Sequence, residues 1–78
     1  MNKEYKLGKI QYNTLHERDE QLVTVTVHCK FGPFNYLTWV WPQFAQSPQG
    51  EKMIAEWAME AWRNEYEKKR QELKGDEL

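Results

Sequence analysis

A chain of 78 residues can form one domain at most, and the core of such a domain is marginally stable unless an oligomer or a partner adds buried surface. The formal net charge of −1 argues against a dedicated nucleic-acid binder, which normally has a basic excess. The single cysteine, Cys29, excludes an internal disulfide, and with no hydrophobic signal segment and no run of membrane-spanning length it predicts a cytoplasmic protein.

The N-terminal part of the chain predicts a strand followed by a polar loop. Residues 3–12 alternate between apolar and polar side chains, but the phase of this alternation changes at Gly8–Lys9. A change of phase inside one strand predicts a β-bulge at that point. Residues 13–20 are polar and charged, which is typical of a solvated connection between strands.

The second predicted strand, residues 21–31, has the clearest pattern in the chain. Apolar and β-branched side chains alternate strictly with polar ones, as in a strand with one buried face. This apolar side is called the valine face below. It consists of Val23, Val25, Val27, Cys29 and Phe31.

The third predicted strand, residues 34–41, follows a turn expected at Gly32-Pro33. It is apolar on both sides, with Trp39 and Trp41 on one face and Tyr36 on the other. We expect this strand to lie at an edge of the sheet, where proteins normally place charged residues against unwanted pairing. Because it has aromatic residues instead, we expect the edge to be paired or used in binding.

A long helix is predicted over residues 48–74. Ser47 is a suitable N-cap, and Pro48 fits the first helical position, where its missing N–H has no partner to lose. Gly75 follows the last periodic residue and can adopt the left-handed conformation that ends helices.

The apolar arc of this helix is about twice as wide as the stripe on an ordinary surface helix. One sheet face cannot cover so wide an arc, so part of it needs a different neighbour. The residues expected to pack on the valine face are Ile54, Trp57, Ala58 and Ala61. The opposite margin, expected to face a partner, consists of Met59, Trp62 and Tyr66.

Three strands with short connections, followed by one helix, predict an α+β fold over residues 1–78, a three-stranded antiparallel β-meander with a long C-terminal helix packed on the sheet (βββα). Two apolar surfaces are then uncovered, and we expect them to bind a protein partner or a second copy in a homodimer. In the alternative, Tyr5, Tyr12 and residues 42–46 cover them within the monomer. The candidate partner-binding residues are Tyr36, Trp39, Trp41, Met59, Trp62 and Tyr66, with Glu60, Arg63 and Glu67 as charged rim.

The sequence offers little catalytic chemistry. It has no glycine-rich phosphate loop and no acid pair in an apolar setting, and His28 and Cys29, adjacent on a strand, point to opposite faces. Cys29 is most simply a small buried residue, and His16 lies in a loop. Two histidines and one cysteine without ligand spacing predict neither a metal nor another cofactor. We therefore expect no enzymatic activity.

Nucleic-acid binding is the main alternative to protein binding. Unpaired bases could stack on the aromatic residues of the third strand, close to Lys6, Lys9 and Lys30. The many glutamates of the helix would repel phosphate, so nucleic acid is the weaker candidate for a partner. These carboxylates could instead imitate a phosphate track, but the lysines and arginines between them favour an ordinary solvated face.

In its size, its lone cysteine, its many aromatic residues and its meander-plus-helix plan, the chain resembles the small inhibitor proteins of bacteriophages, anti-CRISPR proteins among them. The resemblance covers the whole chain but rests on no specific residues, so no site residue is transferred from it. It implies a non-enzymatic inhibitor or adaptor that occupies a working surface on a host complex or holds that complex in an idle state.

Overall fold

The computed structural model describes the backbone of residues 2–76 and the side chains of residues 2–70. Three antiparallel strands form one open sheet in the order β1-β2-β3. Their bounds are Asn2–Asn13 for β1, Arg18–Cys29 for β2 and Gly32–Val40 for β3. The strand order is the meander that the sequence predicts.

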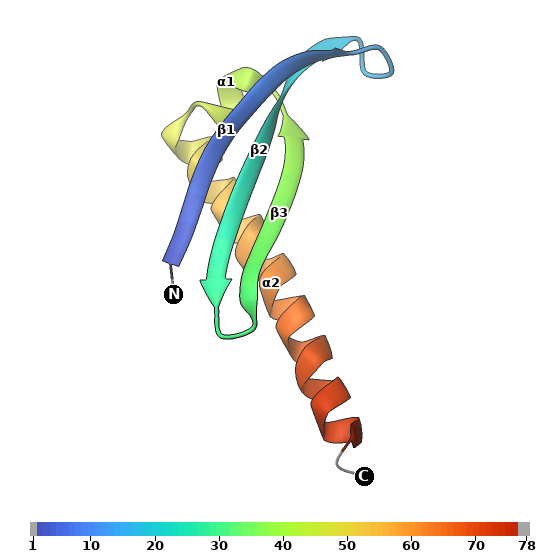
Figure 1. Ribbon diagram of the computed structural model, residues 1–78. Coiled ribbons are helices and arrows are strands. Elements are labelled where there is room, and N and C mark those ends of the chain that lie inside the picture. The colour runs from blue at the N-terminus through green and yellow to red at the C-terminus, as the bar shows by residue number, and fades with distance from the viewer. Residues whose placement is uncertain (1, 77–78) are drawn as a thin grey trace.

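Two helices follow the sheet. A short helix, α1 (Pro42–Ala45), which the sequence did not predict, leads into the long helix α2 (Pro48–Asp76). Both lie on one side of the sheet, and α2 crosses behind β3 and projects past the end of the sheet (Figure 1). The predicted α+β fold, a β-meander followed by one long helix, is confirmed.

The connection between β1 and β2 is shorter than the loop predicted over residues 13–20. Only residues 14–17 form the turn, with Glu17 at a φ of 53°, and Arg18 already pairs with Asn13. The strand extends through this charged segment because Glu20 is buried against Arg18 rather than solvated. Polarity alone could not distinguish such an internally paired segment from a loop.

The turn between β2 and β3 lies two residues before its predicted position. Cys29 pairs with Gly32, which leaves Lys30 and Phe31 as the turn residues. Phe31 is therefore not a strand residue of the valine face. Gly32 still serves the turn, because its φ of 98° would strain a residue with a side chain.

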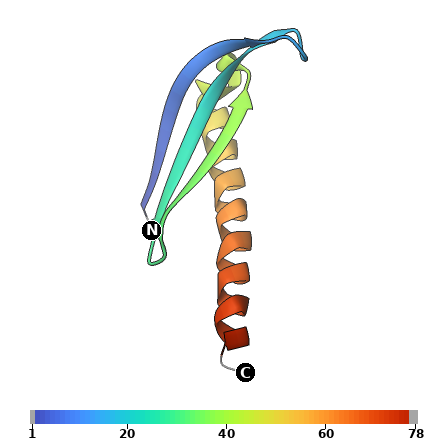
Figure 2. The same cartoon turned by 45° about the vertical axis from the view of Figure 1, so that its right-hand side comes forward.

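The predicted bulge in β1 is confirmed. The register shifts between Leu7 and Ile10, so that Gly8 and Lys9 together lie opposite Leu22. A bulge bends its strand and increases the local twist. Beyond this point the β1–β2 hairpin curves over the start of the helical layer (Figure 2).

The core lies between the sheet and the two helices. Its fully buried apolar residues are Val23, Val25, Val27, Ala45, Ile54 and Ala58. Around them pack Tyr5, Phe34, Tyr36, Val40, Phe44, Met59 and Trp62, all half-buried. The predicted packing of Ile54 and Ala58 on the valine face is confirmed, whereas Trp57 lies at the margin of the core and is 36% exposed.

Helix α2 begins as predicted but does not end as predicted. The Ser47 hydroxyl accepts a hydrogen bond from the Gly50 N–H at 2.9 Å, which is the expected N-cap. At the other end the helix continues through Gly75 to Asp76. Glycine is tolerated inside a helix at a cost of roughly 0.5–1 kcal/mol relative to alanine, so its presence alone did not determine the boundary.

Candidate functional site

The register of β2 and β3 divides the candidate residues of β3 between the two faces of the sheet. Tyr36 pairs with Val25 and therefore points toward the helices, where it packs against the core. Trp39 pairs with Leu22 and lies on the open face, 42% exposed. The alternation had placed these two residues on opposite faces, but without the β2–β3 register it could not show which of them shares the valine face that the helix covers.

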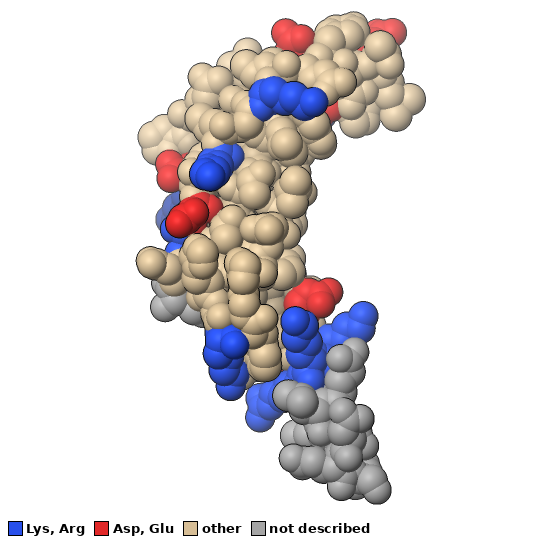
Figure 3. Space-filling view, viewed as in Figure 1, with Lys and Arg blue, Asp and Glu red and all other residues tan. Residues whose placement is uncertain are grey.

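Three apolar residues lie together on the open face, and we call them the open-face patch: Leu22, Leu37 and Trp39. Leu37 pairs with Thr24 next to the Leu22–Trp39 pair and is 58% exposed. The space-filling view looks at this face and shows its centre free of charge, with lysine and arginine gathered near the lower end (Figure 3). In the described part of the chain no helix covers these side chains.

A groove at the C-terminal end of β3 brings three tryptophans together, and we call it the tryptophan groove. It has a volume of about 210 Å³ and is lined by Arg18, Trp39, Val40, Trp41, Phe44 and Trp57. The Arg18 guanidinium carbon lies 5.1 Å from the centroid of Trp41, a cation–π contact. Since Trp39 belongs to both the groove and the open-face patch, the two surfaces are continuous.

Four residues of this groove were not among the predicted site residues: Arg18, Val40, Phe44 and Trp57. Trp57 was expected to pack on the valine face, but its ring stacks on Phe44 at 5.9 Å between centroids. Arg18 was assigned to a loop. The unpredicted helix α1 explains the position of Trp57, because it presents Phe44 to that ring. Arg18 reaches the groove because β2 already begins at this residue, where its charge is paired with Glu20. Pro42, followed by Phe44 three positions before the N-cap residue Ser47, was the sequence signal that could have indicated α1.

The helix margin predicted to face a partner is largely covered within the chain. Met59 and Trp62 pack against the core. The ring of Tyr66 lies 5.3 Å from that of Trp62 and 5.4 Å from that of Phe31, measured between centroids. The β2–β3 turn therefore supplies the neighbour that the wide apolar arc requires. The rim residues Glu60, Arg63 and Glu67 are exposed beside this margin.

One of the two apolar surfaces, the helix margin, is covered within the chain, but by Phe31 and the core and not by the residues that the alternative named. The side chain of Tyr5, on β1, packs against the core between the sheet and the helices, and its hydroxyl donates a hydrogen bond to the Ala45 carbonyl at 2.5 Å. Tyr12 is exposed and covers neither surface. Phe44, in the segment 42–46, covers part of Trp57. None of these contacts reaches the open-face patch.

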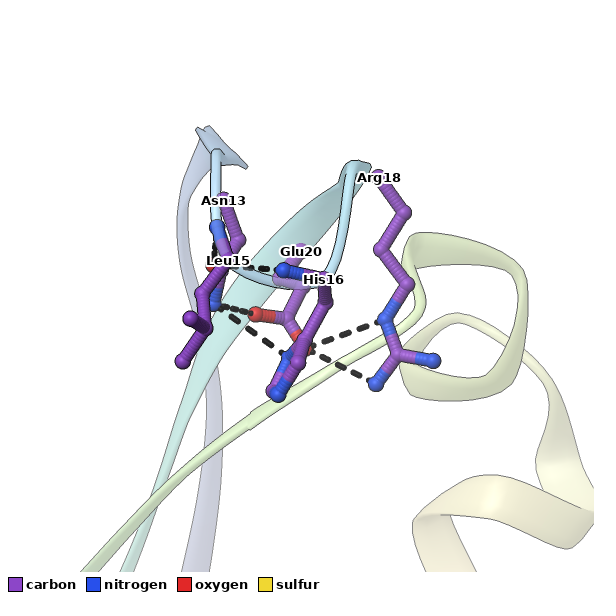
Figure 4. Close-up of polar contacts among 5 residues, drawn as sticks. All are labelled: Asn13, Leu15, His16, Arg18 and Glu20. Atoms are coloured by element: carbon purple, nitrogen blue, oxygen red, sulfur yellow. Dashed lines mark hydrogen bonds and ion pairs between the residues drawn. The ribbon is translucent and has the colours of Figure 1, made fainter.

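A polar cluster in the β1–β2 hairpin was not predicted (Figure 4). The buried Glu20 carboxylate accepts hydrogen bonds from Asn13 through one oxygen and from Arg18, at 3.0 Å, through the other. His16 Nδ1 lies 3.5 Å from the same oxygen as Arg18. Hydrogen bonding by Asn13, Arg18 and His16 lowers the pKa of Glu20, with that of Asn13 the largest cause.

The same cluster shapes the turn that it closes. The Asn13 side-chain oxygen accepts hydrogen bonds from the backbone N–H groups of Leu15, at 2.9 Å, and His16, at 3.1 Å. A hollow of about 530 Å³ lies beside it, and Trp39 is one of its lining residues. Because both oxygens of Glu20 already have partners, the cluster braces the hairpin that overhangs the tryptophan groove and offers no free acid.

Cys29 is half-buried at the other end of the sheet. A hydrogen bond from the Trp62 side chain is the largest cause of the lowered pKa of its thiol, and Phe31 and Lys69 act in the same direction. His28 lies on the opposite face, 3.5 Å from Glu4. The predicted separation of Cys29 from His28 thus holds, and the pair does not form a nucleophile and base.

Comparison with protein-family models, with curated proteins and with solved structures finds no match to this chain. In the described residues, no helix combines the length and the apolar character that crossing a membrane requires. Those residues also contain no group of three or more His, Cys, Asp or Glu side chains placed to hold a metal ion. The candidate site is the continuous surface formed by the open-face patch and the tryptophan groove.

Proposed function

We propose that the protein is a non-enzymatic inhibitor or adaptor that binds a protein partner through the open-face patch and the tryptophan groove. One observation supports this most directly: Trp39 and Trp41 are half-exposed and line one groove beside an apolar sheet face. Tryptophan and arginine are the residues most enriched among the anchors of protein interfaces. Here Arg18 already lies against Trp41, so the two anchors are preorganised.

The partner we propose is a complex of a bacterial host, and the protein would block a working surface of that complex. This part of the proposal draws on the resemblance to phage inhibitor proteins of the anti-CRISPR type. It fits a chain in which the buried carboxylate of the hairpin, Glu20, is paired internally. Such a protein needs a binding surface and no catalytic activity.

The nucleic-acid alternative draws less support from the geometry. Stacking of successive bases needs several aromatic rings on one face, together with a basic groove that follows the backbone. Tyr36 faces the helices, which leaves Trp39 as the one aromatic residue of β3 on the open face. Lys6 lies on that face beside Thr24, but Glu4 lies there too, opposite Thr26.

Affinity capture with matched variants tests the proposal. The tagged chain is exposed to a bacterial lysate, and the captured proteins are identified by mass spectrometry. We expect one host complex to be captured by the wild type and lost with Trp39→Ala combined with Trp41→Ala. Leu15→Ala is the control, because Leu15 is an 85% exposed apolar residue in the hairpin turn, outside the groove.

Circular dichroism on each variant separates loss of binding from loss of fold. Equal capture by the wild type and the double variant would exclude this surface. A titration with single-stranded and double-stranded oligonucleotides at two salt concentrations tests the alternative, since phosphate contacts weaken steeply with salt. Tight, salt-sensitive binding of an oligonucleotide without capture of any protein would favour the alternative.

A further inference from the structure

The two edges of the sheet are built differently. β1 has charged residues at Lys3, Glu4, Lys6 and Lys9, and it contains a bulge. Charges, bulges and prolines are among the devices by which proteins keep an edge strand from pairing with another chain, and of these β3 has only a proline, Pro33 at its second position. β3 has no charged residue in its nine positions and, in the described residues, pairs with β2 and no other strand. Its free side is an open pairing edge.

The molecule also has more surface than a compact chain of its mass. Its accessible surface is 5974 Å², whereas a 9.5 kDa monomer is expected to expose about 5,000 Å². Its radius of gyration is 15.3 Å, compared with roughly 11–12 Å for a compact domain of this length. The excess area is similar to the roughly 800 Å² that each partner buries in a standard interface. The projecting end of α2 contributes part of this excess (Figure 1).

Charges are divided between the two ends of the molecule. Acidic residues outnumber basic ones at the hairpin end, formed by residues 8–20 and 48–61. They are Glu17, Asp19, Glu20, Glu51, Glu56 and Glu60, against Lys9, Arg18 and Lys52.

Basic residues outnumber acidic ones at the opposite end, formed by residues 2–7, 30–31 and 62–70. They are Lys3, Lys6, Lys30, Arg63, Lys68, Lys69 and Arg70, against Glu4, Glu65 and Glu67. The space-filling view shows this division, with red side chains at the hairpin tip and blue ones gathered at the lower end (Figure 3).

We propose that two copies of this chain associate through β3, in an antiparallel pairing that joins their sheets into one sheet of six strands. A two-fold axis perpendicular to the sheet generates this arrangement and makes the interface self-complementary. It places the acidic end of each copy beside the basic end of the other. A parallel pairing would bring like ends together. No like charges meet along the shared edge, because β3 has none.

This pairing explains two further features. It keeps both helical layers on the same side, so the two open faces form one wider surface. It also brings the projecting basic part of α2 to the level of the partner's acidic hairpin end. The proposal does not depend on the proposed function, since a dimer can form whether or not a host complex binds.

Light scattering on the purified full chain over a range of concentrations tests the pairing. We expect the wild type to be a dimer. For Leu37→Lys we expect the dimer dissociation constant to rise by about tenfold or more, because the two new lysines would bring like charges together across the paired β3 strands. Ile10→Lys is the matched control on β1, because Ile10 is 53% exposed and Leu37 is 58% exposed. We expect the control to remain as dimeric as the wild type.

Each possible outcome decides the matter. A wild type that stays monomeric at the concentrations used for NMR overturns the proposal. The free edge of β3 would then be a surface for a strand of a different protein. A Leu37→Lys variant that is folded and as dimeric as the wild type excludes β3 as the interface. Equal weakening by Ile10→Lys excludes it as well, because the effect would then not be specific to that edge.

Two measurements do not depend on how Leu37→Lys folds. In a mixture of isotope-labelled and unlabelled wild-type chains, isotope-filtered NMR should show contacts between the β3 strands of different copies, and their absence in a dimer would exclude the pairing. Spin labels at Leu15→Cys, with Cys29→Ser, report the orientation. Antiparallel pairing places the two hairpin tips at opposite ends of the dimer, so a short distance between the labels would exclude it.

Discussion

The tryptophan groove and the helix margin at Trp62 and Tyr66 are made of the same residue types, yet only the groove is free to bind. Trp62 packs against the core and Tyr66 contacts Phe31, so the margin is closed by the β2–β3 turn. Trp41 is 54% exposed, and its neighbour in the groove is Arg18. An aromatic excess therefore does not identify an interface until the neighbours of each ring are known.

The difference arises from how α2 is rotated on the sheet. Trp57 and Trp62 are five positions apart, which in a helix with 3.6 residues per turn places them on well-separated sides. Both cannot face the valine residues. Phe44 of α1 stacks on Trp57, and Phe31 of the β2–β3 turn contacts Tyr66, and in this arrangement Trp62 packs inward.

The largest expected effect concerns Trp62. We predict that Trp62→Ala lowers the free energy of unfolding by about 2–3 kcal/mol, because truncating a packed aromatic residue loses burial and leaves a cavity. Urea denaturation followed by circular dichroism measures this loss. The matched change in the groove, Trp39→Ala, should cost less than half as much. Equal losses at the two positions would show that the distinction between core and groove is wrong.

A second prediction concerns the junction that builds the groove. A Cβ on Gly50 would lie 1.7 Å from the carbonyl oxygen of Phe44, a backbone atom that cannot move without shifting α1. We predict that Gly50→Ala destabilises the fold by about 2 kcal/mol, which is typical of overpacking.

The matched control for that variant is Gly8→Ala, whose added Cβ would lie 3.1 Å from the Leu22 carbonyl oxygen and requires a much smaller shift. Thermal unfolding of both variants should rank Gly50→Ala as the less stable. The opposite order would mean that α1 is not held tightly against the first turn of α2.

Features that depend on neighbouring residues could be predicted from the sequence. The bulge at Gly8–Lys9 follows from a change of phase, and the N-cap at Ser47 follows from residue type and position. The alternation of β2 revealed the valine core for the same reason. The fold could be predicted because short connections leave few ways to arrange three strands and one helix.

Features that depend on distant contacts could not be predicted in the same way. Alternation divides the residues of β3 between two faces, but it does not give the register with β2, so it could not show that Tyr36 shares the valine face and Trp39 does not. The strand at Arg18 looked like a loop because its charges are paired through Glu20, which becomes apparent only when the hairpin is folded. Of the residues of the candidate site, the predicted partner-binding residues include Trp39 and Trp41, and the other residues were not among them.

A third prediction concerns acid stability at the hairpin that overhangs the groove. The pKa of Glu20 is lower in the folded chain than its usual value near 4.5, chiefly because Asn13 donates a hydrogen bond to the carboxylate. The ionised side chain therefore stabilises the fold at neutral pH, and this contribution is lost as the pH falls through the folded pKa. As the pH is lowered below 4.5, we expect the melting temperature of Glu20→Gln to fall less than that of the wild type.

Glu17→Gln is the control for that experiment, because Glu17 is an exposed acid in the turn of the same hairpin. Its melting temperature should follow the wild-type dependence on pH. If both variants, or neither, differ from the wild type in acid, the polar cluster does not brace the hairpin and the shape of the groove must be maintained by other contacts.

The smallest expected effect tests the groove most directly. Trp41→Ala should change the free energy of unfolding by no more than about 0.5 kcal/mol, as is usual for surface positions, because the residue is half-exposed and lies outside the core. If the groove is a binding surface, the same substitution should weaken partner binding by more than about 1 kcal/mol. Urea denaturation and a binding titration on one preparation measure both quantities. A loss of stability as large as the loss of binding would make Trp41 a structural residue, and the groove would then belong with the closed helix margin.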